Sequence, residues 1–159
     1  EGVGVVSRMG VICTCELWIG GGSMEQVNNI LLWPFGHECF VFPVRNMITW
    51  FLNKHNIGGV TVNVYLKDKM NCWGYCEQNA ENGELAYEIR ICTRQSLRDF
   101  TATLMHELVH VQQWEENEWE GDGELEAENR QYKLADEYWD SMKTQKRKMH
   151  LKMNLYQPE

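Results

Sequence analysis

A stripe of apolar side chains that begins just after Ser96 constrains the fold more than any other feature of this 159-residue chain. Its members recur at spacings of three and four residues: Leu97, Phe100, Leu104, Leu108 and Val111. This period is that of an α-helix with one buried face. Ser96 and Asp99 resemble a capping box in which Asp replaces the usual Glu, so the pattern predicts a helix that starts at Ser96.

The residues before this helix predict one further helix and a small sheet. Apolar positions from Pro43 to His55 have helical spacing. Residues 60–66 alternate between apolar and polar side chains, which predicts a strand, and a second strand is predicted after the turn-rich stretch 71–75. Residues 79–83 predict a turn, and residues 84–92 alternate again as a third strand. Together with the two long helical patterns that end the chain, these elements predict an α+β fold.

The helix after Ser96 carries the sequence His106-Glu107-Leu108-Val109-His110. Two histidines four positions apart lie one helical turn from each other on the same face, so both imidazoles can reach one ion. Zinc accepts such nitrogen ligands in a roughly tetrahedral arrangement. Glu107 is placed where its carboxylate can take a proton from a water molecule that the metal activates. The alternative interpretation is a pair of surface histidines on an amphipathic helix.

A catalytic zinc site needs a third protein ligand, and histidine does not supply it nearby. A metzincin site requires Gly and then His just downstream, but those positions hold Gln113 and Glu116. No histidine lies between His110 and His150. Glutamate is therefore the remaining ligand type in this region.

Glu124 is the best candidate for the third ligand, because it follows a turn at residues 121–123 that lets a second helix fold back. Glu128 lies on the same helix face four positions later and could hydrogen-bond a ligand histidine. Ala127 is small enough to let two helices approach closely. Glu126 and Glu128 remain alternatives as the ligand itself, and a solvated acidic face is the alternative for all three glutamates.

The His106-Glu107-Leu108-Val109-His110 motif followed by Glu124-x-x-Ala127-Glu128 resembles the gluzincin metallopeptidases, and the short connection between its two parts resembles the compact minigluzincins. The family has Asp at the position of Glu128. The resemblance covers roughly residues 60–140. It implies a zincin-like fold, in which a small mixed sheet is followed by an active-site helix and a second long helix carries the third ligand. Residues 24–159 would then form one metallopeptidase domain.

The resemblance implies a zinc-dependent endopeptidase that acts on a peptide or protein substrate. Zn²⁺ would be held by His106, His110 and Glu124, and Glu107 would be the general base. In such families an edge strand holds the substrate backbone, and residues 84–92 are expected in that role. Tyr132, Tyr138 and His150 lie downstream, where a donor to the oxyanion often sits, and Tyr132 is the best candidate. A packing role is the alternative for all three. The alternative function is a catalytically silent zincin-like module that binds metal or serves as a scaffold.

Charge and hydropathy indicate which partners and which cellular location to expect. The net charge of −8 argues against a general nucleic-acid binder, and only the basic run 143–152 favours a DNA-associated protease. No apolar run reaches the length of a membrane span and no signal peptide is recognisable, so we expect a soluble intracellular protein.

Residues 20–23 read Gly-Gly-Gly-Ser before Met24, which suggests that residues 1–23 are an appended or fused segment. A natural glycine loop is the alternative.

Overall fold

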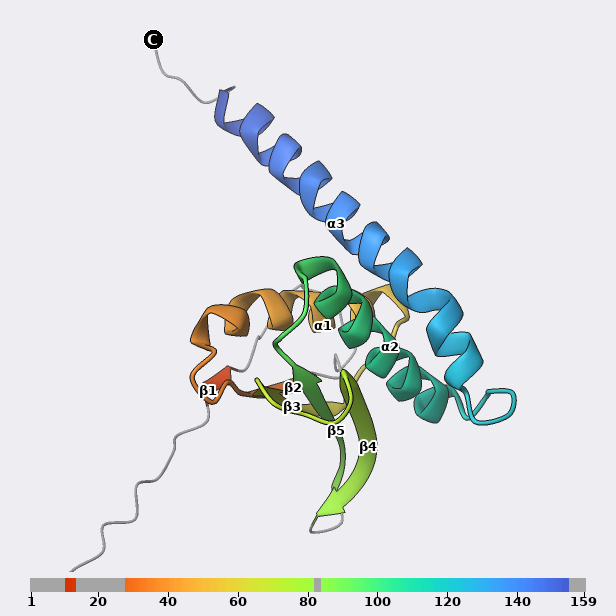
Figure 1. Cartoon of the computed structure of the whole chain (residues 1–159). Coiled ribbons are helices and arrows are strands. Elements are labelled where there is room, and N and C mark those ends of the chain that lie inside the picture. Colours follow the sequence, from red (N-terminus) through yellow and green to blue (C-terminus); the bar gives the residue numbers. More distant parts are fainter. Residues whose placement is uncertain (1–10, 14–27, 82–83, 155–159) are drawn as a thin grey trace, which may run out of the picture. The chain divides into compact units, whose positions relative to one another are not determined.

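A computed structural model of the chain describes residues 11–13, 28–81 and 84–154 and shows a mixed α+β fold (Figure 1). The chain divides into two compact units, Glu1–Arg94 and Gln95–Glu159. The first unit contains the sheet and the second contains the two long helices.

The first unit is built on a five-stranded sheet with the strand order β1-β2-β3-β5-β4. Its strands are β1 (Val11–Cys13), β2 (Asn29–Trp33), β3 (Thr61–Lys67), β4 (Gly74–Glu81) and β5 (Glu84–Cys92). Strands β2, β3 and β5 run parallel to one another, while β1 pairs antiparallel with β2 and β4 pairs antiparallel with β5 at the two ends of the order. The strands alternate between buried and less buried side chains, so one face of the sheet carries the apolar core.

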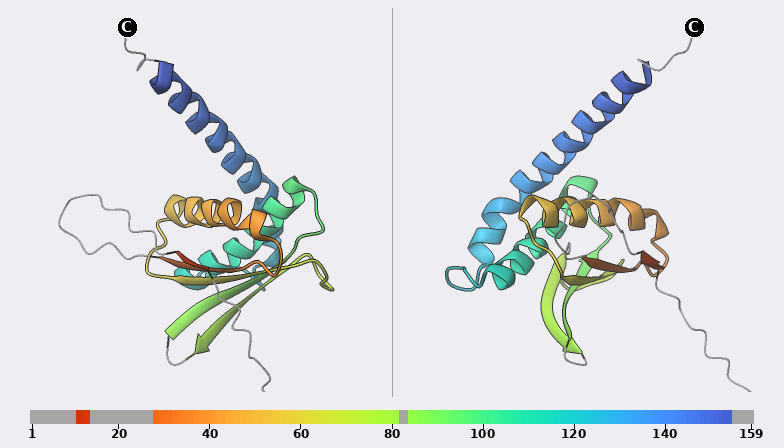
Figure 2. Two further views of the ribbon diagram at one scale, coloured as in Figure 1. Left: turned by 90° about the vertical axis from the view of Figure 1, so that its left-hand side faces the viewer. Right: turned by 180° about the vertical axis from the view of Figure 1, so that it is seen from behind.

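Helix α1 (Val41–Lys54) connects β2 to β3, after the short helix η1 (Glu38–Phe40), and lies over one face of the sheet (Figures 1 and 2). Its buried residues recur at helical spacing: Val44, Met47, Ile48, Phe51 and Leu52. Burial of these side chains together with the inward side chains of β2, β3 and β5 forms the core of this unit.

The second unit is a hairpin of helices α2 (Leu97–Glu116) and α3 (Glu124–Asn154). The hydroxyl of Ser96 caps α2 by accepting a hydrogen bond from the backbone N–H of Asp99 at 3.1 Å. At the other end, Asn117 adopts a left-handed conformation with φ 53°, and its N–H is bonded to the Gln113 carbonyl. Both ends of α2 are therefore fixed by local sequence.

Side-chain contacts between α2 and α3 hold the hairpin together. Near the start of α2, the hydroxyl of Tyr132 donates to Asp99 at 2.9 Å, and the indole of Trp139 donates to Thr101 at 3.2 Å. Near the connecting loop, Ala127 is fully buried. Because α3 has 31 residues and α2 has 20, the last part of α3 continues beyond the start of α2, as the two views of Figure 2 show.

Most of the predicted elements are confirmed. Helix α1, the strands β3 and β5, and the helix after Ser96 lie where the periodicity placed them, and the two long helices pack on each other. The prediction of a turn over residues 79–83 is wrong for 79–81, which belong to β4, while 82–83 lie outside the described residues. The sequence patterns placed no element at β2, because a continuous apolar run such as Ile30–Trp33 has no period that identifies a strand.

The prediction that residues 84–92 form an edge strand is also wrong. Strand β5 pairs with β3 on one side and with β4 on the other, so β4 is the strand at that end of the described sheet. The reason is the hairpin order: β4 precedes β5 in sequence but adds outside it, while β3 occupies the inner side. The interpretation of residues 1–23 as an appended segment lies outside the described residues, except that 11–13 form β1. No described helix has an apolar stretch of the length that a bilayer crossing requires.

Candidate metal centre

The two motif histidines face the same point beside α2. Because one helical turn separates His106 and His110, their Nε2 atoms lie 3.3 Å apart. The ring planes are inclined at 77° with centroids 5.0 Å apart, so the rings meet edge to face and both nitrogens remain accessible to one ligand position. Both side chains are largely buried, with exposed fractions of 15% and 11%.

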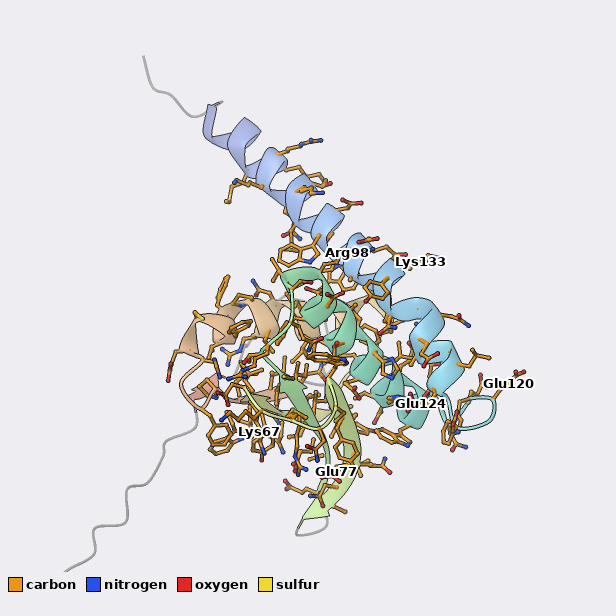
Figure 3. All side chains as sticks on the ribbon, in the orientation of Figure 1. Lys67, Glu77, Arg98, Glu120, Glu124 and Lys133 are labelled. Carbon is orange, nitrogen blue, oxygen red and sulfur yellow. The ribbon has the colours of Figure 1, made fainter. Side chains whose placement is uncertain are left out.

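Glu124 joins the histidines from the first residue of α3. Its Oε2 lies 3.1 Å from His106 Nε2, and its Oε1 lies 3.3 Å from His110 Nε2. The connecting loop sets this position, because the Asp122 carboxylate accepts a hydrogen bond from the Glu124 N–H at 3.1 Å. Figure 3 marks Glu124 at this end of the helix. The sequence prediction of Glu124 as the carboxylate that meets both histidines therefore agrees with the geometry.

The spacing of the two histidine nitrogens fits the edge of a tetrahedral site, and both Glu124 oxygens lie close to them. Ligand distances of about 2.0–2.1 Å place neighbouring ligand atoms about 3.3–3.4 Å apart on the edges of a tetrahedron. The two Nε2 atoms lie 3.3 Å apart, which matches that edge length, and each is approached by a different oxygen of Glu124, at 3.1 Å for His106 and 3.3 Å for His110. Taken with one ligand atom per residue, the three groups lie within 4.8 Å of one another. Within the described ranges, His106, His110 and Glu124 are the one group of His, Cys, Asp or Glu residues whose donor atoms converge in this way.

Burial favours the neutral form of the first histidine. It lowers the pKa of His106, and the neighbouring His110 lowers it further, whereas the charges of Glu124 and Glu128 oppose the shift. A metal ligand must be the neutral imidazole, so the environment prepares His106 for that role.

Glu107 lies between the two histidines in sequence and is 5% exposed. Burial, and after it the negative charge of Glu124, raises the pKa of Glu107 to about 8. A cation bound next to it would act in the opposite direction, because positive charge stabilises a carboxylate. The described part of the chain supplies no hydrogen bond to the Glu107 carboxylate.

Sequence reasoning gave no role to Gln113, which the structure places directly behind His110. Its amide is 4% exposed, and Oε1 lies 2.9 Å from His110 Nδ1. The amide nitrogen donates to the Gly123 carbonyl at 3.0 Å and to the Glu126 carboxylate at 2.9 Å. One signal was available: a polar residue three positions after the second histidine lies on the buried helix face.

The other two glutamates near the start of α3 do not join the donor group. Glu126 receives hydrogen bonds from Gln113 and from Arg130, the latter at 2.5 Å. Glu128 is exposed and, within the described residues, hydrogen-bonds neither histidine. The side chain that contacts the His110 ring therefore comes from α2 itself, whereas Glu128 acts on His106 through its charge alone and not through a described hydrogen bond.

The candidate oxyanion donors lie far along α3 from the donor group. At 1.5 Å per residue, Tyr132, Tyr138 and His150 follow Glu124 by about 12, 21 and 39 Å of helix. The Tyr132 hydroxyl is bonded to Asp99, two turns before the first histidine. Tyr138 is 3% exposed, and burial raises its pKa. The contacts of Tyr132 and the burial of Tyr138 thus give neither tyrosine the position of an oxyanion donor.

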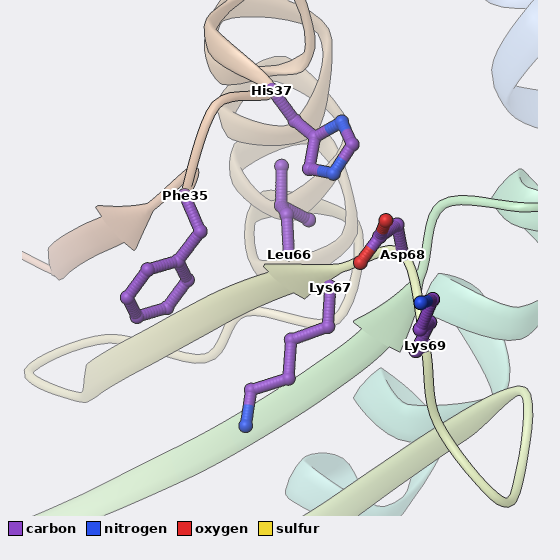
Figure 4. A pocket seen from close by; sticks show the side chains of 6 residues that line it. All are labelled: Phe35, His37, Leu66, Lys67, Asp68 and Lys69. Carbon is purple, nitrogen blue, oxygen red and sulfur yellow. The ribbon is translucent and has the colours of Figure 1, made fainter.

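A separate cavity of about 260 Å³ lies in the first unit, between the segment after β2 and the end of β3 (Figure 4). Its wall consists of Phe35, His37, Leu66, Lys67, Asp68 and Lys69. The Lys67 ammonium group points away from the His37 ring, and the remaining charges are of mixed sign. This cavity lacks the convergence of donor atoms that distinguishes the metal centre.

Comparison of the chain with models of protein families, with curated proteins and with solved structures gives no match. The chemistry of this site therefore rests on its own residues and their geometry.

Proposed function

We propose that this chain is a zinc-dependent peptidase of the gluzincin type, with a zincin-like fold. The observation that carries the proposal is the convergence of His106, His110 and Glu124 at 3.1–3.3 Å beside the buried carboxylate of Glu107. Two nitrogens and one carboxylate oxygen are the donors of known catalytic zinc sites, which retain one position for water or substrate.

In this proposal the metal and the buried carboxylate have separate roles. Bound zinc supplies Lewis acidity, which activates water near neutral pH and polarises a substrate carbonyl. Glu107 accepts the proton of the attacking water and delivers it to the leaving amine. Burial supports this role, because a carboxylate with a raised pKa both accepts and returns a proton near neutral pH.

One observation favours the alternative, a metal-binding module without catalysis. The oxyanion of a tetrahedral intermediate needs a hydrogen-bond donor, and the candidates on α3 lie away from the donor group. Glu107 favours the enzyme, because a purely structural zinc site has no need of a buried carboxylate without a hydrogen bond from the described residues.

Elemental analysis and peptide hydrolysis test the proposal together. Purified protein should contain about one zinc ion per chain, and His106→Ala should lose it. Glu107→Gln keeps the size of the side chain and removes its basicity, so zinc content should be retained while hydrolysis falls about 10²–10⁴-fold. Glu116→Gln is the matched control, since it makes the same change at an exposed position of α2 and should retain activity.

Two results would count against the enzyme. A zinc-loaded wild type that cleaves nothing in a broad peptide library, and that is indistinguishable from Glu107→Gln, leaves only the metal-binding module. A protein that takes up no zinc, even when it is supplied in excess, removes both functions.

A further inference from the structure

The side-chain amide of Gln113 lies behind His110, and both its oxygen and its nitrogen are hydrogen-bonded. It is buried and has three partners: the His110 ring, the Gly123 carbonyl and the Glu126 carboxylate. A buried amide with this many partners has one favourable orientation, because reversing it would oppose like groups.

The partners decide which end of the amide faces the histidine. The Gly123 carbonyl and the Glu126 carboxylate can only accept hydrogen bonds, so both must face the amide NH₂ group. The carbonyl oxygen Oε1 is thereby directed at His110 Nδ1, 2.9 Å away.

The orientation of the amide in turn decides the tautomer of the histidine. Oε1 has no proton to donate, so the hydrogen bond exists only when Nδ1 of His110 carries one. In a neutral imidazole the proton on Nδ1 leaves Nε2 with a free lone pair. Nε2 is the atom that faces His106 and Glu124, at 3.3 Å from each.

Residues of α3 hold the amide from behind. Arg130 donates to Glu126 at 2.5 Å and to Gln112 at 2.8 Å, which fixes the carboxylate that Gln113 contacts. Gly123 leaves the necessary space, since a Cβ at that position would lie 2.3 Å from Gln113 Oε1. The orientation of Gln113 is therefore set by the loop and by α3.

We propose that Gln113 is a positioning residue that holds His110 in the Nδ1–H tautomer and so presents an unprotonated Nε2 before any metal binds. The part of this inference that concerns metal affinity rests on the proposed function, whereas the part that concerns the tautomer does not. Partners that fix the ring of a ligand histidine in this way typically change metal affinity by about 10–100-fold when they are removed.

The tautomer is measured in the metal-free protein by ¹⁵N NMR of labelled histidine at alkaline pH, where imidazoles are neutral. In the wild type, His110 should show protonated Nδ1 and unprotonated Nε2. Gln113→Leu removes the acceptor and should release the ring into a mixture of tautomers. Gln113→Glu keeps an acceptor for Nδ1 but loses both amide donors, so it should preserve the tautomer even if stability falls.

Zinc titration supplies the second readout. Gln113→Leu should weaken zinc binding about 10–100-fold, and Gln113→Glu should recover most of that loss. Gln131→Leu is the control, because it makes the same change at a half-buried glutamine of α3 that shares no described hydrogen bond with Gln113 or with either histidine. It should bind zinc like the wild type.

The outcomes separate this proposal from the proposed function. A wild-type His110 with its proton on Nε2, or an unchanged Nδ1–H tautomer in Gln113→Leu, overturns the role of Gln113. Equal losses in the Leu and Glu variants show a packing role only and overturn it too. A protein that binds no zinc but shows the Nδ1–H tautomer overturns the proposed function and leaves the assignment of Gln113 intact.

Discussion

The amide of Gln113 fills the space in which a side chain of Gly123 would begin. A Cβ on Gly123 would lie 2.3 Å from Gln113 Oε1 and 2.9 Å from its Nε2, closer than unbonded heavy atoms approach. The same amide donates to the Gly123 carbonyl at 3.0 Å. The loop that starts α3 and the residue behind His110 are thus fitted to each other.

Replacing the two loop glycines should separate backbone strain from this contact. Gly121 and Gly123 both have positive φ, at 60° and 81°, but a Cβ on Gly121 meets nothing within 4 Å. Gly121→Ala should therefore cost only the left-handed conformation, about 1–2 kcal/mol. Gly123→Ala should cost about 1–3 kcal/mol more, because the Gln113 amide must move and leave buried partners unpaired.

Urea unfolding measures the two stabilities, and zinc titration measures the consequence for the site. Gly123→Ala should weaken zinc binding, whereas Gly121→Ala should not. Equal effects of the two substitutions on both measurements would show that Gln113 does not depend on the space at Gly123.

Replacing each of the three glutamates at the start of α3 by Ala should weaken zinc binding to a different extent. Loss of a hydrogen-bond partner of a ligand histidine typically weakens metal binding about 10–100-fold. Glu124→Ala removes a ligand atom itself, so it should weaken zinc binding by more than that. Glu126→Ala releases Gln113 and should fall within that range. Glu128→Ala should bind as the wild type does, since Glu128 is exposed and contacts neither histidine through a described hydrogen bond. Calorimetric titration gives all three values, and normal binding by Glu124→Ala contradicts the ligand assignment.

Asp99 should make the stability of the helical hairpin depend on pH in the acidic range. Hydrogen bonds from the hydroxyls of Ser96 and then Tyr132 lower the pKa of Asp99 below its usual value. A lowered folded-state pKa means that this stabilisation is present above the unfolded pKa of about 3.9 and is lost as the pH falls through the folded pKa. Asp99→Asn should be less stable than the wild type at neutral pH, and the difference should narrow in acid. Urea unfolding over a pH series checks this, and a difference independent of pH contradicts it.

What could be predicted from the sequence was the local part of the structure. The helix after Ser96 and its two histidines follow from spacing alone, because a helix fixes which residues share a face. The turn at residues 121–123 made a returning helix plausible and so placed Glu124 near the histidines. Helix α1 and the strand β3 have clear periods and were predicted for the same reason.

The parts that escaped prediction depend on partners distant in sequence. The inner position of β5 follows from which strands pair with it, and the period of one strand does not contain that information. The role of Gln113 depends on the register between α2 and α3, which brings Gly123 and Glu126 to its amide. The same register carries Tyr132 to Asp99, away from the histidines.

Ala127 should limit how closely α3 can approach α2. It is fully buried at the helix contact, three residues after Glu124. Ala127→Leu should cost about 1–3 kcal/mol by overpacking, and the displaced start of α3 should weaken zinc binding. Leu125→Ala is the control, because Leu125 is 70% exposed and its loss should change stability by no more than about 0.5 kcal/mol. Thermal unfolding with and without zinc distinguishes the two, and a zinc affinity unaffected by Ala127→Leu would show that Glu124 does not depend on this contact.

Tyr132→Phe tests whether the Tyr132 hydroxyl takes part in catalysis. The Tyr132 hydroxyl is bonded to Asp99, and its ring lies 4.7 Å from the guanidinium carbon of Arg98, so its environment is the start of α2. Removing the hydroxyl should therefore raise the pKa of Asp99 toward its usual value and leave peptide hydrolysis unchanged. Loss of a true oxyanion donor instead lowers kcat by about 10²–10³-fold, with little change in substrate binding. Steady-state kinetics of the zinc-loaded variant, beside NMR titration of the carboxylate, separates the two outcomes. A fall of that size in kcat would mean that Tyr132 leaves Asp99 when substrate binds, and an unchanged pKa of Asp99 would contradict the hydrogen bond in the free protein.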